Sequence, residues 1–175
     1  MTAPVLTTER IELRPFARED GEALHALFTD AEVRRWLLDG DVVPRAWVDD
    51  EIASSEARFA RGWCGLWTIR EPPSEAVVGF VGFRPFFNPP EQQLLYGLLP
   101  SHWGRGFATE AARAAVAHAF ETLGFAEVRA ATDVPNAASM EVLLRLGFEE
   151  WKRTEEGPAG TAFFRLAAAR WRPVR

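Results

Sequence analysis

The amino-acid sequence predicts a mixed α/β fold with one sheet, mostly antiparallel, that contains a parallel central pair of strands. Two observations predict it. Strand-like runs follow one another across short loops between residues 65 and 99, as in antiparallel hairpins. A strand, a helix and another strand then occupy 92–132, and a crossover of this kind leaves its two strands parallel. We expect about six or seven strands flanked by about four or five helices.

The length and composition fit one domain over residues 1–175, of which about 1–8 form a short tail. Hydrophobic residues make up 47% and charged residues 26%, as in a globular protein. The net charge of −5 and the lack of a basic block argue against nucleic-acid binding. With neither a signal-like segment nor a long apolar run, we expect no membrane partner and a cytoplasmic location.

Cysteine and histidine usage gives no indication of a metal site. Cys64 is the only cysteine, which excludes an internal disulfide and a cysteine metal cluster. The three histidines are far apart and lack ligand spacing. We therefore expect no metal, and we expect Cys64 to be a buried residue without a chemical role.

The remaining elements can be predicted in chain order. Polar and apolar residues alternate up to Pro15, Asp20 is placed to cap a first helix, and Pro44 suits the first turn of a third. Gly124 and Gly147 should each end a helix, followed by a phenylalanine that folds back on it. The ranges expected are strands at 10–14, 65–70, 77–84, 92–99, 127–132, 149–155 and 161–168, helices at 31–38 and 109–123, and a hinge at 157–160.

Between the strand at 92–99 and the helix at 109–123 lies a loop that contains Gly104 and Gly106. Free N–H groups and the positive end of the helix dipole meet at such a point and favour an anion such as phosphate. A Gly-x-Gly turn is by itself a weak signal, and most such turns bind nothing. The loop has neither the Gly-Lys-Ser/Thr of a Walker loop nor the third glycine of a dinucleotide fingerprint.

Three ordered motifs nevertheless resemble those of the GNAT acetyltransferases. Trp103–Ala108 resembles the family's acetyl-CoA pyrophosphate loop, and Pro100–Ala111 matches the branch that resembles the ribosomal-protein-alanine N-acetyltransferases, the RimJ/RimL-like enzymes. Leu6–Pro15 resembles the opening strand. Asn136–Ser139, with Leu146–Phe148 after it, resembles the second element that contacts CoA.

The resemblance implies a fold whose two central parallel strands splay apart, so that the pantetheine arm of CoA pairs with their free backbone groups. It implies an acetyl-CoA-dependent N-acetyltransferase in which a primary amine, from a protein N-terminus or a small molecule, attacks the thioester directly. The residues that it assigns to acetyl-CoA are Leu98, Leu99, Trp103, Gly104, Arg105, Gly106, Phe107, Ala108, Thr109, Asn136 and Ser139.

Within that set, the resemblance implies individual roles. The amide of Leu98 or Leu99 should polarise the thioester carbonyl, and Arg105 should bring positive charge near the diphosphate. Ser139 is a candidate general acid for the CoA thiolate, or else a solvated serine at a helix start. Asn136 suits a helix N-cap, a CoA contact, or both.

The general base is the point of departure from the family. Many relatives carry a glutamate where Gln92 or Gln93 stands, and an amide cannot take a proton. Two other side chains are candidates for the base, but Glu91 is expected in the loop and His102 beside the phosphates. Without a side-chain base, water would carry the proton. The missing base also motivates an alternative, a non-catalytic acyl-CoA-binding or regulatory domain. A third hypothesis is a nucleotide-binding protein.

The acceptor side is predicted only in outline. Trp36, Trp63 and Trp67 fall in regions where the family builds it, although core packing is the expected role of all three. A peptide acceptor would need an open groove between 31–47 and 157–160, which Trp36, Leu37 and Leu38 could line or close. The chain is expected to be a monomer or a homodimer.

Overall fold

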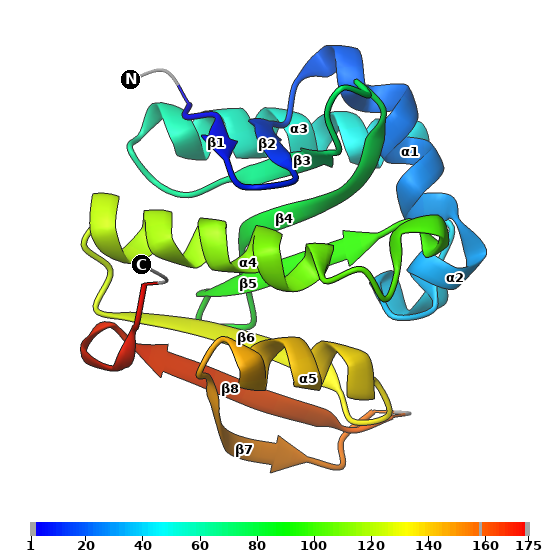
Figure 1. The fold of residues 1–175 in the computed structure, drawn as a ribbon. Helices are drawn as coiled ribbons and strands as arrows, with labels where there is room; N and C mark the ends of the chain where they lie inside the picture. The colour runs from blue at the N-terminus through cyan, green and yellow to red at the C-terminus, as the bar shows by residue number, and fades with distance from the viewer. Residues whose placement is uncertain (1–2, 158, 174–175) are drawn as a thin grey trace.

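The computed structural model describes residues 3–157 and 159–173 and contains one open eight-stranded sheet in the order β1-β2-β3-β4-β5-β6-β8-β7 (Figure 1). Neighbouring strands are antiparallel except β5 and β6, which are parallel, so the predicted mixed sheet is confirmed. The strands are β1 Leu6–Thr7, β2 Glu12–Pro15, β3 Leu66–Arg70, β4 Val77–Phe86, β5 Glu91–Leu98, β6 Glu127–Asp133, β7 Glu149–Thr154 and β8 Thr161–Ala167.

The extra strand comes from the segment that we placed in a tail. Leu6 pairs with Leu13 in the sheet, so this part of the tail is ordered structure. At the other end, β7 and β8 form the expected pair, although Pro158 in the predicted hinge lies outside the described residues.

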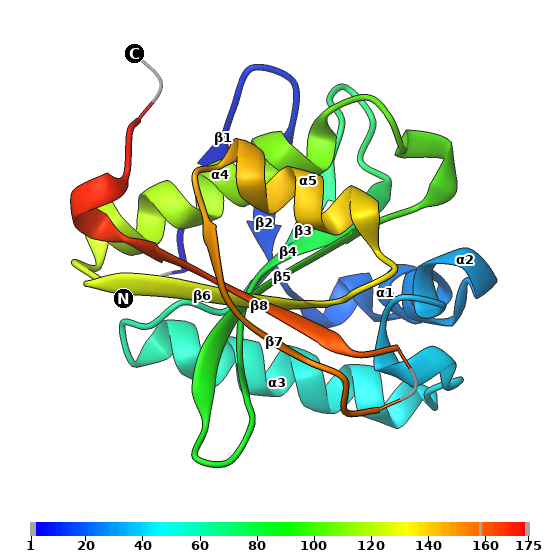
Figure 2. The same ribbon diagram turned by 90° about the horizontal axis from the view of Figure 1, so that it is seen from below.

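Five α-helices cover the two faces of the sheet (Figure 2). They are α1 Gly21–Thr29, α2 Ala31–Arg34, α3 Arg45–Ala60, α4 Phe107–Ala117 and α5 Ala137–Arg145. One core joins α4 and α5 to the sheet, and a second joins α1 and α3 to the opposite face. We call these the α4 face and the α3 face.

Strand alternation assigns the side chains of the central strands to these faces. Leu94 and Leu98 of β5 belong to the α4-face core, whereas Leu95 packs against the α3-face core. Side chains alternate along a strand, so even-numbered residues of β5 point to the α4 face and odd-numbered ones to the α3 face. In β6, Val128 and Ala130 belong to the α4-face core, which places the odd-numbered residues of that strand on the α3 face as well.

Helix α4 follows directly from the sequence pattern. Ala111, Ala112, Ala115 and Val116 are fully buried, and their spacing is that of one face of a helix. The helix begins at Phe107, two residues earlier than Thr109, because Gly106 takes the left-handed N-cap conformation with φ 80°. Its last predicted turn, His118–Thr122, is a π-helix.

The helix after β6 also ends as predicted. Gly147 has φ 92° and donates to the Leu144 carbonyl at 3.0 Å, and the Phe148 amide donates to the Leu143 carbonyl at 3.0 Å. These two bonds make a Schellman motif, in which glycine relieves the left-handed strain.

Two predictions for the N-terminal helices were wrong. Asp20 makes no capping hydrogen bond; its carboxylate instead pairs with Arg70, and both side chains are buried. The second helix stops at Arg34, and Leu38 and Asp39 follow in the left-handed region with φ of 56° and 54°. Non-glycine residues adopt this conformation only at a cost, so the surrounding structure must impose the turn.

Two tryptophans and the single cysteine differ in their burial. Trp67 is fully buried and its indole donates to the Pro4 carbonyl, whereas Trp63 is 52% exposed, so its expected core role was wrong. Cys64 is buried, and burial raises the pKa of its thiol to about 12. Among the described residues, no helix combines the length and apolarity that a membrane span needs.

Candidate functional site

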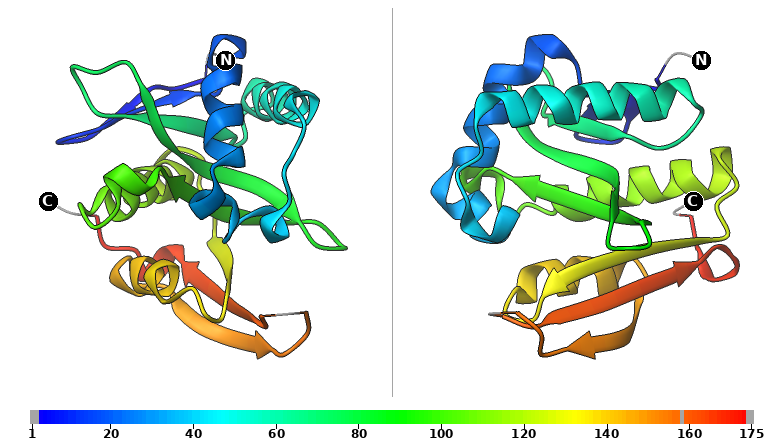
Figure 3. Two further views of the ribbon diagram at one scale, coloured as in Figure 1. Left: turned by 90° about the vertical axis from the view of Figure 1, so that its right-hand side faces the viewer. Right: turned by 180° about the vertical axis from the view of Figure 1, so that it is seen from behind.

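The two parallel strands at the centre of the sheet separate. β5 and β6 share a single paired position, Gln93 with Arg129, whereas β4 and β5 pair from Phe86 and Glu91 to Gly79 and Leu98. Beyond the shared position the strands run apart toward their C-terminal ends, which the view from behind shows (Figure 3). The backbone groups on the facing edges are therefore left for another partner.

Hydrogen-bond alternation decides which amides face this gap. The Leu99 amide donates to the Val78 carbonyl at 2.9 Å, so it is already used inside the sheet. In an antiparallel ladder, alternate residues point their N–H groups to the same neighbour. The amides of Leu98 and Tyr96 consequently face the gap. Of the two amides predicted as oxyanion donors, the Leu98 amide is available, whereas the prediction for the Leu99 amide was wrong.

A cavity of about 770 Å³ passes through the gap from the α4 face to the α3 face. This volume lies within the range of small-molecule sites. Nine of the residues that we assigned to the ligand line it, and Leu99 and Arg105 do not. The nine are Leu98, Trp103, Gly104, Gly106, Phe107, Ala108, Thr109, Asn136 and Ser139.

The loop before α4 is open toward this cavity. Gly104 and Gly106 have φ of 70° and 80°; a Cβ on Gly104 would meet nothing within 4 Å, and one on Gly106 would meet only Arg10 Nη2 at 3.3 Å. A ligand can thus reach the backbone closely at the N-terminus of α4. Trp103 fixes the loop to β5, because its indole N–H donates to the Leu98 carbonyl at 2.8 Å.

The N-terminal segment braces the first turn of α4. The Glu110 carboxylate accepts hydrogen bonds from the Thr8 hydroxyl at 2.6 Å and from the Arg10 amide at 2.9 Å, and the Arg10 guanidinium pairs with it. Burial alone would raise the pKa of Glu110, but these hydrogen bonds outweigh it and hold the pKa below its usual range. The opening segment therefore positions the loop.

Arg105 does not bring its charge to the cavity. Its guanidinium pairs with Glu71, with Nη1 at 3.0 Å from Oε2, and lies 4.4 Å from the Phe107 ring centre. The hydrogen bond from Arg105 lowers the pKa of Glu71, which keeps this carboxylate charged. His102, in contrast, lines the cavity within the loop, and its Nε2 lies 3.5 Å from Glu71 Oε2.

Helix α5 and strand β5 bring two hydroxyl groups together, those of Ser139 and Tyr96. Asn136 is the N-cap, as predicted, and its Oδ1 accepts from the Ser139 amide at 3.1 Å. The Tyr96 hydroxyl lies 3.0 Å from both Ser139 Oγ and the Ser139 carbonyl oxygen. Burial raises the pKa of Tyr96 to about 12, so its phenol stays protonated.

Sequence reasoning missed Tyr96. A signal was present, because Tyr96 is the only tyrosine of the chain and lies in the otherwise apolar run 94–99, two residues before Leu98. Buried tyrosines need a partner for the hydroxyl. The partner, Ser139, is 43 residues away, so no local pattern names it.

On the α3 face, the glutamine at the branch point is buried. Gln93 is 3% exposed, its Nε2 donates to Glu91 Oε2 at 3.3 Å, and its Oε1 has no hydrogen-bond partner among the described residues. Glu91 is the first residue of β5 and pairs with Arg129 at 2.7 Å, so its predicted place in the loop was wrong.

The mouth of the cavity on this face is lined by Trp36, Leu37 and Leu38, with Thr161 of β8 also among the lining residues. Trp36 therefore belongs to the site, whereas Trp63 and Trp67 do not line it.

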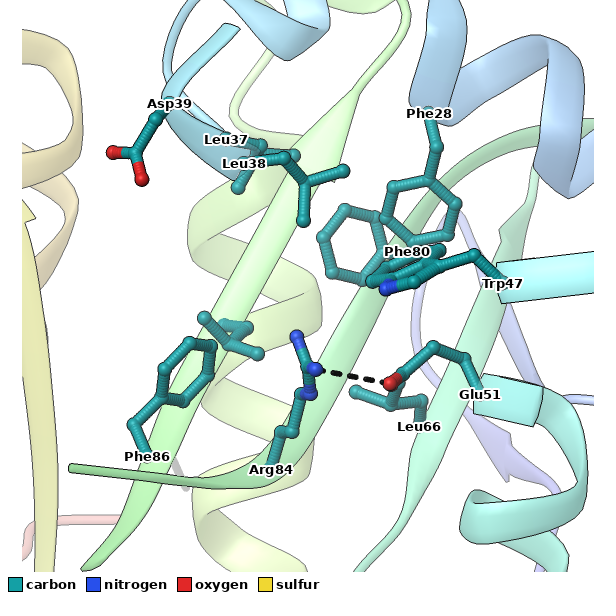
Figure 4. A pocket seen from close by; sticks show the side chains of 11 residues that line it. Phe28, Leu37, Leu38, Asp39, Trp47, Glu51, Leu66, Phe80, Arg84 and Phe86 are labelled. Atoms are coloured by element: carbon teal, nitrogen blue, oxygen red, sulfur yellow. Dashed lines mark ion pairs between the residues drawn. The ribbon is translucent and has the colours of Figure 1, made fainter. Parts of the chain in front are cut away.

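A second cavity of about 280 Å³ adjoins the first on the α3 face (Figure 4). Phe28, Trp47 and Phe80 form aromatic walls, and Arg84 pairs with Glu51 at 3.0 Å. Burial raises the pKa of Glu51. The two cavities share Leu37, Leu38, Asp39, Phe86 and Leu95.

Comparison with known proteins gives one family. A family model described as an acetyltransferase (GNAT) domain matches residues 10–149. The uncharacterized N-acetyltransferase YoaA of Bacillus subtilis is 29% identical over 150 residues, which cover 84% of each chain. The FsC-acetyl coenzyme A-N(2)-transacetylase of Aspergillus fumigatus is 30% identical over 162 residues, covering 82% of this chain and 64% of that one.

Solved structures agree on the fold. An acetyltransferase from Agrobacterium tumefaciens superposes with a TM-score of 0.80 at 25% identity, covering 95% of both chains. RimL, described as a ribosomal L7/L12 alpha-N-protein acetyltransferase in complex with coenzyme A, has a TM-score of 0.80 at 16% identity, covering 94% of this chain and 98% of that one. At that identity the second likeness concerns the fold alone.

Proposed function

Because this chain belongs to the GNAT acetyltransferase family and is an acetyltransferase, we propose that it transfers the acetyl group of acetyl-CoA to a primary amine, which attacks the thioester directly. The observation that carries the proposal is the gap between β5 and β6, with the Leu98 amide facing it and the open loop before α4 at its end. The same family assignment favours an enzyme over a non-catalytic CoA-binding domain.

The residues present fit acetyl-CoA. The loop from Gly104 to Thr109 would hold the diphosphate on its backbone amides, since no side chain blocks its approach at Gly104 or Gly106. The amide-rich pantetheine arm would lie along β5, where the amides and carbonyls of alternate residues face the gap. Asn136 and Ser139 would contact it from α5.

The reaction needs stabilisation of charge at two atoms. As the amine attacks, the carbonyl oxygen becomes an oxyanion, which the Leu98 amide stabilises; a donor of this kind is typically worth about 3–4 kcal/mol. The Tyr96 amide faces the same gap nearer the branch point and is a second donor. When the C–S bond breaks, the thiolate takes a proton from Ser139 Oγ, whose charge the Tyr96 hydroxyl stabilises across their 3.0 Å contact, and the proton that the amine loses passes through water to restore the Ser139 hydroxyl.

The acceptor enters from the α3 face, past Trp36 and Leu37. Both the protein N-terminus and the small amine stay open as acceptor classes, because RimL and the FsC transacetylase are named for different substrates. The cytoplasmic location and the monomeric or homodimeric state remain predictions from the sequence.

The proposal is tested in two steps. Acetyl-CoA at 100 times its dissociation constant should raise the free energy of unfolding by about 2.7 kcal/mol, whereas ATP should not. Thiol release should then be followed with peptides beginning with Ala, Ser or Met, with free amino acids, polyamines and aminoglycosides. Acetyl-CoA that leaves stability unchanged, or thiol release with none of these amines, would refute the proposal.

A further inference from the structure

The acceptor side of the cavity is acidic. Three carboxylate side chains line its part on the α3 face, Glu32, Asp39 and Asp133. The single lysine or arginine among the lining residues is Arg145 of α5, which pairs with Glu141 one helical turn away. An acceptor in this part of the cavity therefore meets uncompensated negative charge.

Two of these carboxylates flank the reacting centre. Asp133 ends β6 and, as an odd-numbered residue, lies on the α3 face. Counting from the pair of Gln93 and Arg129, its level on β6 matches that of Gly97 on β5, next to the amides of Tyr96 and Leu98. Burial raises the pKa of Asp133, and the nearby charge of Asp39 raises it further.

The turn at Leu38 and Asp39 holds the second carboxylate in place. Both residues have positive φ, and Asp39 lines both cavities. Figure 4 shows the Asp39 carboxylate pointing away from the aromatic walls of the smaller cavity. A cation between two neighbouring carboxylates offsets the repulsion between their negative charges.

A buried acceptor lies farther along the same cavity. Gln93 is 3% exposed and its Oε1 has no partner among the described residues. Such a group costs about 1–3 kcal/mol until an N–H donor reaches it. Along β5, Gln93 lies four residues from the level of Asp133, which is about 13 Å at about 3.3 Å per residue. A donor there must belong to a long ligand.

We propose that the acceptor is an amine with two or more ammonium groups and no carboxylate, bound at its reacting end by Asp39 and Asp133, with its far N–H groups directed to Gln93. This inference rests on the proposed acetyl transfer and specifies its substrate class. A linear polyamine and an amino sugar share the required chemistry, whereas a free amino acid places its own carboxylate against Asp39 and Asp133.

Three probes with four carbons each isolate the charge. Butylamine has one ammonium group, 1,4-diaminobutane has two, and 4-aminobutanoate replaces the second with a carboxylate. With CoA present, calorimetry should give the tightest binding for the diamine, weaker binding for the monoamine, and the weakest for the amino acid. Spermidine and 2-deoxystreptamine then represent the two sources, and at least one should bind more tightly than butylamine.

Substitutions locate the effect. Asp39→Asn and Asp133→Asn should each weaken 1,4-diaminobutane about 10-fold or more, because a charge-assisted hydrogen bond becomes a neutral one. Asp41→Asn is the matched control: it removes the same charge from an exposed residue of the same segment that does not line the cavity, and should change the affinity less than twofold. Acetyl-CoA affinity should stay the same in all three.

The outcomes separate the two proposals. Failure to bind acetyl-CoA refutes the proposed function. Normal acetyl-CoA binding with a diamine that binds no better than 4-aminobutanoate, or with Asp39→Asn and Asp133→Asn indistinguishable from Asp41→Asn, leaves acetyl transfer standing and overturns the polycationic acceptor.

Discussion

Replacing Gly106 with valine should weaken acetyl-CoA binding while leaving the fold in place. Gly106 has φ +80°, and a side chain in the left-handed region costs about 1–2 kcal/mol. The added Cβ would meet only Arg10 Nη2 at 3.3 Å, the end of a flexible side chain that can move aside. Backbone strain is therefore the main cost to folding.

The cost to binding is larger, because the same side chain would stand between the loop amides and the diphosphate. Hydrogen bonds to charged groups contribute about 1.5–3 kcal/mol each. Losing one of them predicts an affinity loss of about 10- to 150-fold. Isothermal titration calorimetry with acetyl-CoA measures this loss directly, and urea unfolding measures the accompanying change in stability.

Gly124→Val provides the matched control. Gly124 also has a left-handed φ, +69°, a Cβ there would meet nothing within 4 Å, and the residue does not line the cavity. The two variants should lose similar free energy of unfolding, but only Gly106→Val should lose acetyl-CoA affinity. Equal dissociation constants for the two variants would show that the loop does not hold the diphosphate.

Three further predictions concern other parts of the chain. Tyr96→Phe removes the hydroxyl beside Ser139 and should lower kcat at least 10-fold with little change in the KM for acetyl-CoA. An unchanged kcat in this variant would show that Tyr96 takes no part in the reaction. Because the pKa of Tyr96 is about 12, the wild-type kcat should show no loss from ionisation of Tyr96 up to pH 10. Asp20→Ala leaves Arg70 buried without its partner and should lower the free energy of unfolding, measured in urea, by about 3–5 kcal/mol. Asp49→Ala, which breaks the exposed pair with Arg45, should lower it by less than about 1 kcal/mol. Equal losses in the two variants would contradict the burial argument. Because the pKa of Glu110 is lowered, its ionised form stabilises the fold above the usual glutamate pKa of about 4.3, and this contribution is lost as pH falls through the folded-state pKa. The difference in the free energy of unfolding between wild type and Glu110→Gln should therefore be constant near neutral pH and shrink in acid. A difference that does not depend on pH would contradict this argument.

Local patterns were sufficient for the framework of the fold. The buried alanines of α4 and the glycine that ends α5 depend on neighbours within a few residues, and the crossover follows once its strand, helix and strand have each been predicted from such local patterns. The loop with Gly104 and Gly106 was found in the same way, because its conformation depends on residue type and on the helix that follows.

The errors arose where a partner lies far away in the sequence. Asp20 has the residue type of a helix cap, yet Arg70, 50 residues later, pairs with it. Arg105 forms an ion pair with Glu71, 34 residues earlier. The difference between the Leu98 and Leu99 amides depends on the phase of pairing with β4, which no property of the two leucines reveals.

The separation of β5 from β6 also creates an exposed strand edge in the middle of a sheet. Unpaired strand edges are templates for other extended chains and lead to aggregation, and proteins usually protect them at the margins of a sheet. Here Trp103 protects one position, since its indole N–H occupies the Leu98 carbonyl at 2.8 Å. The loop that would receive the diphosphate thereby also shields the backbone beside it from foreign strands while the enzyme is empty.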